Sequence, residues 1–105
     1  MKFIKIAHHT EDFKKIPPAK LNELLEAHTY WMEEQKNAGK LLGAYVLAGN
    51  AEGERNITIW DFESPEEIDK CIWEDPMGFT FVWAIYPAVD VFEHIKHVMT
   101  KLSKD

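Results

Sequence analysis

The stretch that decides the fold is 18-PAKLNELLEAHTYWMEEQKNAGKLLGAYVLAG-49, a long amphipathic segment followed directly by an apolar run. Apolar or weakly polar residues recur in it at steps of three and four, which places their side chains on one face of a helix. Pro18 fits the first turn of that helix, and Gly39 can adopt the left-handed conformation that ends it. The stretch therefore predicts a helix over about 19–38 and a strand over 41–48. The predicted buried stripe comprises Leu21, Leu24, Leu25, His28, Trp31, Met32 and Gln35.

The sharpest local signal is Ser64-Pro65-Glu66-Glu67, which has the sequence of a helix start. Ser64 can cap the helix, Pro65 fits its first position and Glu67 completes a capping box. A turn over 50–55 joins the second and third strands into a predicted hairpin, and Pro87 marks the end of the fourth strand. The remaining predicted elements are strands over 2–9, 56–62 and 79–86, a helix over 65–73 and a C-terminal helix over 91–102.

The order of these elements is strand, helix, strand, strand, helix, strand, with one added helix. This order predicts an α+β fold of the ferredoxin-like βαββαβ type, with a four-stranded antiparallel sheet. We expect one domain over 1–105, in which 88–105 form a C-terminal helical extension. Two helices cover only one face of four strands, yet most of the strands are apolar on both faces. The uncovered face therefore predicts a homodimer or a larger homo-oligomer.

The overall composition bounds the class of function. The chain carries 12 Lys and Arg against 18 Asp and Glu, a net charge of −6, which argues against electrostatic binding of nucleic acid or an anionic membrane. Its one cysteine, Cys71, excludes an internal disulfide. The alternating start of the chain lacks the apolar core of a signal peptide, and no segment has the length to cross a bilayer. We therefore expect a cytoplasmic protein whose partners are a small molecule and itself.

Several short motifs follow one another in a recognisable order: Pro18-Ala19-Lys20, the helix ending at Gly39, Leu47-Ala48-Gly49, Trp60-Asp61-Phe62, Ser64-Pro65-Glu66-Glu67 and Asp75-Pro76-Met77. Together they resemble the muconolactone isomerase family within the dimeric α/β-barrel superfamily, which also includes YCII-like proteins and small antibiotic-biosynthesis-type monooxygenases. The resemblance covers roughly 2–87. It implies that two ferredoxin-like protomers pack sheet to sheet, with larger rings built from the dimers. It also implies proton transfer within a small anionic substrate, without a metal or an organic cofactor.

The chain departs from that family at three positions. The resemblance implies an acidic residue where this chain has His28, and basic residues where it has Gly43 and Val46. An enzyme acting on an anionic lactone needs such cations, so these departures bear on the substrate and on the reaction. The segment after Pro87 is also longer than the family pattern implies.

Three histidines and one carboxylate are the candidate catalytic residues. A histidine titrates near neutrality, so His28, or one of His8 and His9, is suited to take and return a proton. The alternatives are that His8 and His9 are strand-end residues in contact with water, and that His28 is a core residue bonded to a backbone carbonyl. Asp61 shares a strand face with apolar residues, so it either pairs with a histidine as an acid–base dyad or caps the next helix.

Aromatic residues are numerous, with 4 Trp, 3 Tyr and 6 Phe, and the candidate substrate-binding residues are among them. A wall of rings with few charges suits a planar or cyclic apolar substrate. The alternative is that the same rings fill the core or cover a dimer interface. The candidates are Trp31, Tyr45, Trp60, Trp83 and Tyr86.

No motif in the chain indicates a cofactor. His8, His9, His28 and Asp61 have no compact metal-ligand spacing, and the glycines match no phosphate or dinucleotide loop. We therefore expect no metal and no cofactor. The leading hypothesis is a small isomerase-like enzyme that transfers a proton within a cyclic or aromatic-derived metabolite, with a role in aromatic compound catabolism. The alternatives are a non-catalytic ligand-binding or assembly module on the same fold, and a cofactor-independent monooxygenase.

Overall fold

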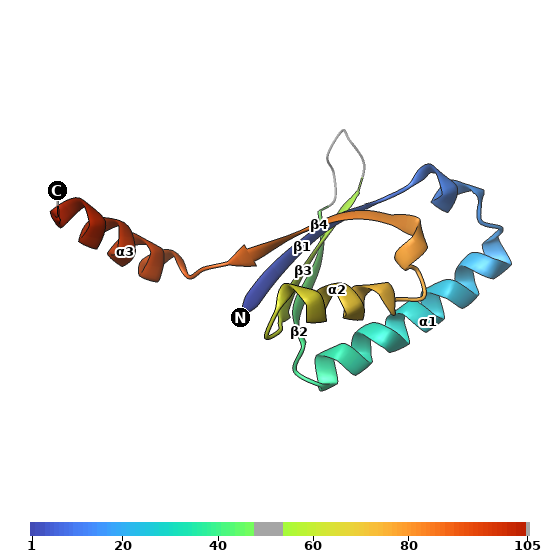
Figure 1. The fold of residues 1–105 in the computed structure, drawn as a ribbon. Helices are drawn as coiled ribbons and strands as arrows, with labels where there is room; N and C mark the ends of the chain where they lie inside the picture. The colour runs from blue at the N-terminus through green and yellow to red at the C-terminus, as the bar shows by residue number, and fades with distance from the viewer. Residues whose placement is uncertain (48–53, 105) are drawn as a thin grey trace.

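A four-stranded antiparallel sheet with two helices on one face forms the body of the protein (Figure 1). The computed structural model describes residues 1–47 and 54–104, so the predicted turn over 50–55 and the motif Leu47-Ala48-Gly49 lie partly outside the described residues. The elements are β1 (Lys2–His9), η1 (Glu11–Lys15), α1 (Pro18–Asn37), β2 (Leu41–Leu47), β3 (Arg55–Asp61), α2 (Pro65–Trp73), η2 (Gly78–Thr80), β4 (Phe81–Ala88) and α3 (Val91–Ser103), where η denotes a short 3₁₀ helix. The strands lie in the order β2-β3-β1-β4, and this topology confirms the predicted ferredoxin-like fold class.

α1 forms where the sequence predicts it because both of its ends carry the expected residues. Pro18 occupies the first turn of the helix. At the other end, Gly39 adopts a φ of 76°, and its N–H donates a hydrogen bond to the carbonyl oxygen of Lys36. The residues of the predicted stripe are at least partly buried, except for Leu25, which lies at the edge of the stripe and is 43% exposed.

The boundaries of β4 differ from the sequence prediction at both ends. The strand begins at Phe81 rather than at residue 79, because residues 78–80 form the short helix η2. The sequence predicts that Pro87 ends this strand, whereas β4 continues to Ala88. β4 is an edge strand, where a proline can turn its missing N–H toward solvent without weakening the sheet.

One hydrophobic core lies between the helices and the sheet. The cluster draws side chains from β1, β3, α2 and the start of β2, and Trp31 is the buried residue that α1 contributes. Burying a large apolar side chain contributes about 1.5–3 kcal/mol, so this cluster holds both helices on the sheet. Its members are Phe3, Trp31, Leu41, Trp60, Phe62, Ile68, Cys71 and Ile72.

The opposite face of the sheet is left uncovered by the described helices (Figure 1). Strand pairing sets Phe3 opposite Trp60 and Lys5 opposite Thr58 on the helix-covered face, so the residues between them point outward. The predicted second apolar face of the sheet is thereby confirmed. Its apolar residues are Ile4, Ile6, Ile57 and Ile59, which are partly exposed, and Tyr45, Leu47, Val82 and Tyr86, which are exposed.

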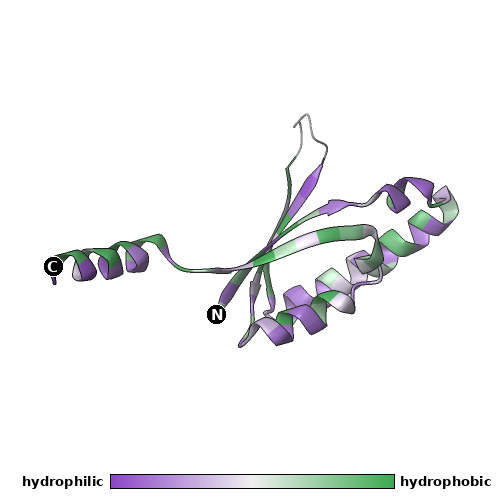
Figure 2. Ribbon diagram, turned by 45° about the horizontal axis from the view of Figure 1, so that its top comes forward, coloured by the Kyte–Doolittle hydropathy of each residue, from purple (hydrophilic) through white to green (hydrophobic). Residues whose placement is uncertain are grey.

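α3 extends away from the body of the protein, and Figure 2 shows an apolar side along it (Figures 1 and 2). Asp90 begins the helix, with its Oδ2 accepting hydrogen bonds from the N–H groups of Phe92 and Glu93. The radius of gyration is 17.0 Å, against about 13 Å for a compact domain of this length. No helix within residues 1–47 and 54–104, α3 included, has the length and apolar character of a membrane span. The apolar residues exposed on α3 are Val91, Phe92, Ile95, Val98, Met99 and Leu102.

Replacing Ser64 by alanine tests the start of α2. The Ser64 Oγ accepts a hydrogen bond from the N–H of Glu67 at 3.3 Å. Since a lost helix cap costs about 0.5–2 kcal/mol, we expect Ser64→Ala to lower the free energy of unfolding by an amount in that range, measured by urea denaturation. Ser103→Ala is the control, because the Ser103 hydroxyl donates only to the carbonyl of Thr100 at the exposed end of α3. Equal losses in the two variants would contradict the capping role.

Candidate functional site

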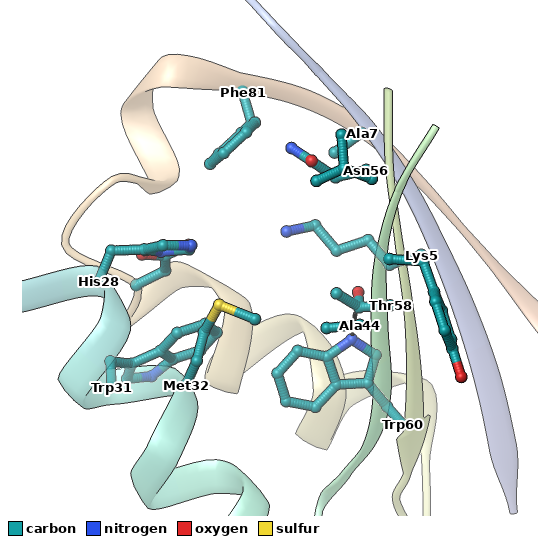
Figure 3. Close-up of a pocket in the computed structure, with 13 residues that line it drawn as sticks. Lys5, Ala7, His28, Trp31, Met32, Ala44, Asn56, Thr58, Trp60 and Phe81 are labelled. Atoms are coloured by element: carbon teal, nitrogen blue, oxygen red, sulfur yellow. Dashed lines mark hydrogen bonds and ion pairs between the residues drawn. The ribbon is translucent and has the colours of Figure 1, made fainter. Parts of the chain in front are cut away.

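A cavity of about 160 Å³ lies between α1 and the helix-covered face of the sheet (Figure 3). Its walls are mainly apolar, and its polar groups come from the three strands β1, β2 and β3, from α1 and from the turn after α2. A protein cavity of about 150 Å³ can hold benzene, so this space suits one ring. The apolar lining residues are Ala7, Trp31, Met32, Ala44, Val46, Trp60 and Phe81, and the polar ones are Lys5, His28, Tyr45, Asn56, Thr58 and Asp75.

A hydrogen bond between His28 and Asp75 forms the centre of the polar wall. The His28 Nδ1 and Asp75 Oδ1 atoms are 2.7 Å apart, and the Asp75 side chain is only 1% exposed. The N–H of Met77 also donates to Oδ1, at 2.9 Å, which fixes the carboxylate in the turn after α2. When Nδ1 carries the proton of this bond, Nε2 is left to accept another, as in a base that a carboxylate orients. Figure 3 shows the His28 ring pointing into the cavity.

The second carboxylate oxygen of Asp75 has unmet hydrogen-bonding capacity. Oδ2 is buried and has no hydrogen-bond partner within the described parts of the chain. A buried acceptor left unpaired costs about 1–3 kcal/mol. Such a group in a native structure is often completed by water or by a ligand, and Asp75 is one of the residues that line the cavity.

Lys5 is the cation of the cavity. The residue is 6% exposed, and its Nζ lies 5.3 Å from the centre of the Phe81 ring and 5.4 Å from that of Trp83. Burial lowers the pKa of Lys5, and the negative charge of Asp75 opposes that effect. Among residues 1–47 and 54–104, no carboxylate forms an ion pair with Lys5. The ammonium group is therefore stabilised by rings rather than by a counter-ion in contact.

Lys5 and Asp75 are the charged groups of the cavity that sequence reasoning misses. Lys5 lies on the same side of β1 as Phe3 and Ala7, and this place among apolar residues is the available signal. The sequence indicates Asp75 only as part of the break after α2, at Asp75-Pro76-Met77. No local pattern points this carboxylate toward His28, because the two residues are 47 positions apart.

The structure separates the predicted catalytic residues from one another. His28 lines the cavity, whereas His8 and Asp61 do not. His8 is exposed on the outer face of the sheet. Asp61 is exposed as well, and its Oδ1 lies 3.2 Å from the amino terminus, while Ser64 caps α2. The carboxylate that pairs with a histidine is thus Asp75 rather than Asp61.

His9 lies beside the cavity and does not contribute to its wall. Its ring stacks on Phe13, with centroids 3.7 Å apart, and on Phe81, with centroids 4.5 Å apart. Burial lowers the pKa of His9, and a hydrogen bond with the backbone of Thr80 opposes that effect. The surroundings favour the neutral ring, so His9 packs behind Phe81 as an aromatic side chain.

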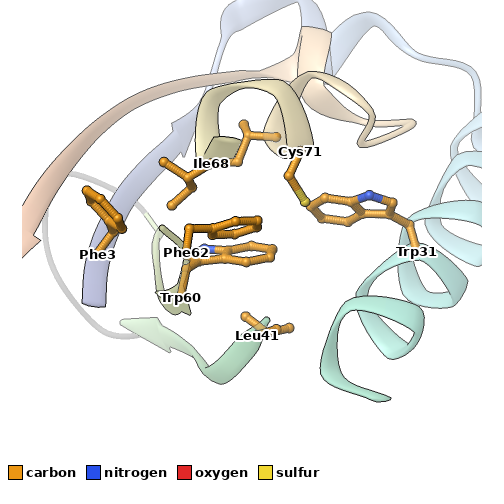
Figure 4. Packing of buried hydrophobic residues seen from close by; sticks show 8 residues of the cluster. Phe3, Trp31, Leu41, Trp60, Phe62, Ile68 and Cys71 are labelled. Atoms are coloured by element: carbon orange, nitrogen blue, oxygen red, sulfur yellow. The ribbon is translucent and has the colours of Figure 1, made fainter. Parts of the chain in front are cut away.

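The five aromatic candidates fall into two groups. Trp31, Tyr45 and Trp60 line the cavity, whereas the half-buried Trp83 and the exposed Tyr86 do not. Figure 4 shows Trp31 and Trp60 within the buried cluster, and their ring centroids are 5.7 Å apart. Both tryptophans therefore serve the core and the cavity at once. Tyr45 borders the cavity, but its pairing with Ile57 places its side chain on the outer face of the sheet, where the residue is 62% exposed.

The described residues offer neither a metal site nor a reactive thiol. Within 1–47 and 54–104, no group of three or more His, Cys, Asp or Glu side chains is placed to hold a metal ion. The Cys71 thiol donates a hydrogen bond to Gln35 Oε1 at 3.3 Å, and burial raises its pKa to about 11. Because the thiolate is the reactive form, Cys71 acts as a core residue.

The cavity brings a base, its orienting carboxylate and a cation to one apolar space. Figure 3 shows the side chains of His28 and Lys5 directed into the cavity from opposite walls, one from α1 and the other from β1. This arrangement can take a proton from a bound ring and stabilise the negative charge that develops on an oxygen of the same ring.

Comparison with known proteins identifies the fold. No family model and no curated protein sequence matches the chain. Among solved structures, it is similar to 5-chloro-2-hydroxyhydroquinone dehydrochlorinase from Burkholderia phenoliruptrix in complex with 2,5-dihydroxybenzoquinone, with a TM-score of 0.67 and 16% identity over 89% of this chain and 98% of that chain. An antibiotic biosynthesis monooxygenase gives a TM-score of 0.48 with 10% identity, over 86% and 100% of the two chains. A protein from Arabidopsis thaliana gives a TM-score of 0.40 with 14% sequence identity, over 86% of this chain and 96% of that chain. The first likeness agrees with the predicted fold class.

Replacing Lys5 by methionine tests the cost of the buried charge. Because desolvation outweighs the attraction to Asp75, we expect Lys5→Met to raise the free energy of unfolding at pH 7 by about 0.5–2 kcal/mol. The folded-state pKa of Lys5 lies below 10.5, so between the two values the unfolded state binds more protons and wild-type stability rises with pH. The advantage of the variant should therefore shrink toward pH 10.

Urea denaturation at pH 7 and pH 10 measures this effect. Lys2→Met is the matched control, because Lys2 is an exposed lysine on the same strand. The assignment of a desolvated charge to Lys5 would be contradicted if the gain in unfolding free energy of Lys5→Met grew with pH. It would also be contradicted if Lys2→Met showed the same gain.

Proposed function

We propose that the protein is a small isomerase-like enzyme that transfers a proton within a small, planar cyclic substrate, using its own side chains. The observation that carries this proposal is the placement of the His28–Asp75 pair and Lys5 in one aromatic cavity. A structural core histidine needs only a backbone carbonyl as its partner. His28 instead bonds to a buried carboxylate and directs its ring into a space of about 160 Å³.

In this proposal His28 is the general base. Its Nε2 takes a proton from a carbon next to a carbonyl group and returns it to another position on the same ring. Asp75 holds the imidazole in one tautomer and stabilises the imidazolium that forms. Histidine serves this purpose because it gains and loses a proton near neutral pH without a large change in its surroundings.

Lys5 is proposed to stabilise the substrate oxygen that becomes negative when the proton leaves. A cation in a low-dielectric wall stabilises an enolate more strongly than the same cation in water. The family resemblance implies basic residues at Gly43 and Val46, which this chain lacks. Lys5 supplies a positive charge from β1 instead, and Val46 lines the same cavity.

The proposed substrate is a single ring that carries carbonyl, hydroxyl or carboxylate oxygens. Trp31, Trp60 and Phe81 offer flat apolar surfaces, and the cavity volume matches one ring rather than two. The dehydrochlorinase with the similar fold was solved with 2,5-dihydroxybenzoquinone, which is a ligand of this size and chemistry. A hydroxylated aromatic compound, a cyclic enone or an unsaturated lactone fits these requirements, in keeping with a role in aromatic compound catabolism.

Deuterium exchange measures the proposed reaction directly. Cyclohex-2-enone and an unsaturated γ-lactone, incubated with the protein in D₂O, should gain deuterium next to the carbonyl, and NMR follows the rate. Because loss of a general base costs about 10²–10⁴-fold in rate, we expect His28→Gln to slow the exchange by a factor in that range. Asp75→Asn should also slow it, since the amide no longer stabilises the imidazolium.

His97→Gln on α3 is the matched control, because this histidine is exposed and lies outside the cavity. Deuterium exchange by His28→Gln at the wild-type rate would contradict the proposal. Saturable binding of the ring by the wild-type protein without exchange would favour the ligand-binding alternative. Oxygen consumption with a phenolic substrate would favour the monooxygenase alternative.

We also propose that the protein works as a homodimer whose subunits meet through the outer face of the sheet. That face combines partly exposed isoleucines with the exposed side chains of Val82 and Tyr86. An apolar face of this extent is unusual on a monomer in water. A two-fold axis would set the face of one copy against the same face of its partner and bury both.

Sedimentation velocity tests the dimer, using variants of residues that are exposed in the single subunit. Val82 and Tyr86 are 50% and 55% exposed, so the double variant Val82→Lys/Tyr86→Lys should keep the subunit folded and sediment as a monomer. The control is Asn22→Lys/Asn37→Lys, which adds the same charge to exposed positions of α1. A dimer that survives the strand substitutions, or a wild-type monomer at micromolar concentration, would contradict the proposal.

A further inference from the structure

We propose that Lys5 is a covalent nucleophile, which forms an imine with the carbonyl carbon of a small cyclic ketone or aromatic aldehyde bound in the cavity. This inference rests on the cavity and ligand class of the proposed function, and it deepens that function by naming how the carbonyl is activated. His28 would then move the protons of imine formation as well as those of the substrate.

The first support is the position of the Lys5 amine. Figure 3 shows its side chain reaching from β1 into the cavity, with the His28 ring on the opposite wall. The pairing of Lys5 with Thr58 on one side and Ile85 on the other fixes its backbone in the middle of the sheet. With 6% exposure, the amine is presented to the cavity rather than to solvent.

The second support is the charge environment of the amine. A lysine held by a carboxylate stays protonated, but no carboxylate of the described residues forms an ion pair with Lys5. Burial lowers the pKa of Lys5, so more of the neutral amine is present near pH 7 than for an exposed lysine. Desolvation of this kind is one of the ways in which proteins activate lysines for imine chemistry.

The step balances without any added reactant. The lone pair of the neutral amine attacks the carbonyl carbon, a C–N bond forms, and the π electrons of C=O move to oxygen. A proton passes from nitrogen to that oxygen through His28 Nε2, and this gives a carbinolamine. His28 takes up the proton that the Lys5 ammonium loses on becoming neutral, and at this stage it delivers that proton to the hydroxyl. The C–O bond then breaks with loss of water, and the nitrogen lone pair completes a protonated imine.

The cavity is suited to the cation that this step produces. The positive charge of the protonated imine would stay near the position now held by Nζ, 5.3 Å from the Phe81 ring centre and 5.4 Å from that of Trp83. Asp75 adds an attractive negative charge to this environment. The protonated imine withdraws electrons from the neighbouring C–H, so His28 removes that proton more readily than from the free ketone.

Reductive trapping tests the covalent step on the intact wild-type protein. Benzaldehyde and cyclohex-2-enone are the probes, sodium cyanoborohydride reduces any imine to a stable amine, and peptide mass spectrometry locates the product. We expect Lys5 to be modified roughly tenfold faster than the exposed Lys2 on the same strand, because the cavity holds the carbonyl of the probe beside the Lys5 amine. Phenol, which fits the cavity but has no carbonyl, should protect Lys5 and leave Lys2 unaffected.

Variants separate the covalent role from a purely electrostatic one. Lys5→Arg keeps the positive charge but cannot form an imine, so it should lose the deuterium exchange of cyclohex-2-enone if the imine is required. His28→Gln should slow the trapping at Lys5 and leave that at Lys2 unchanged. Modification of Lys5 no faster than that of Lys2, or full exchange by Lys5→Arg, would overturn the inference.

The two proposals fail in distinguishable ways. Deuterium exchange by the wild-type protein with no product trapped at Lys5 would leave the proton-transfer function standing and remove the imine. Trapping at Lys5 with no exchange next to the carbonyl would establish the nucleophile and remove the proposed proton transfer.

Discussion

The hydrogen bond between His28 and Asp75 joins the middle of α1 to the turn that follows α2, across 47 positions of the chain. Trp31 is the buried residue of α1, so this bond adds a polar link to a helix whose other contacts come from partly buried residues. The carboxylate is 1% exposed, and salt and water therefore screen the interaction less than they would at the surface. The same bond shapes the wall of the cavity and orients the imidazole within it.

The elements of the fold could be predicted from the sequence because each is specified locally. Each feature depends on residues only a few positions away in the sequence. Examples are the apolar stripe of α1, the left-handed conformation of Gly39 and the helix cap at Ser64. The candidate site depends on contacts between distant segments, and the prediction reached it only in part. His28, Trp31 and Trp60 could be selected because they stand on apolar faces of predicted elements. The charged residues Lys5 and Asp75 could not be selected in this way.

Two physical reasons explain the missed residues. A lysine within an alternating strand is usually solvent-facing, and only the packing of α1 over the sheet shows that Lys5 lies on the covered side. An aspartate before a proline has the local appearance of a turn residue, and Asp75 does form a turn while also directing its carboxylate inward. Asp61 was the better candidate by strand alternation, yet the outer face of the sheet leaves it exposed.

The interior of the protein divides into two halves with different chemistry. Phe3, Ile68 and Ile72 form a fully apolar half, which gains stability from burial alone. The half that contains Lys5 and the unpaired Oδ2 of Asp75 carries groups that cost stability unless a ligand or water satisfies them. Natural proteins concentrate such local conflicts at functional sites, where stable surroundings tolerate them.

The C-terminal arm has a thermodynamic consequence of its own. α3 has 13 residues, and an isolated helix of that length is only marginally stable in water. Its apolar side is exposed and packs on no other element of the described residues, so contact with another molecule would stabilise the helix. Different equilibria therefore set the hydrogen-exchange protection of the backbone amides in α3 and of those in the sheet. The amides of α3 lose protection directly when molecules separate on dilution, whereas the sheet amides lose only the stability that pairing of two sheets adds to the folding of each subunit.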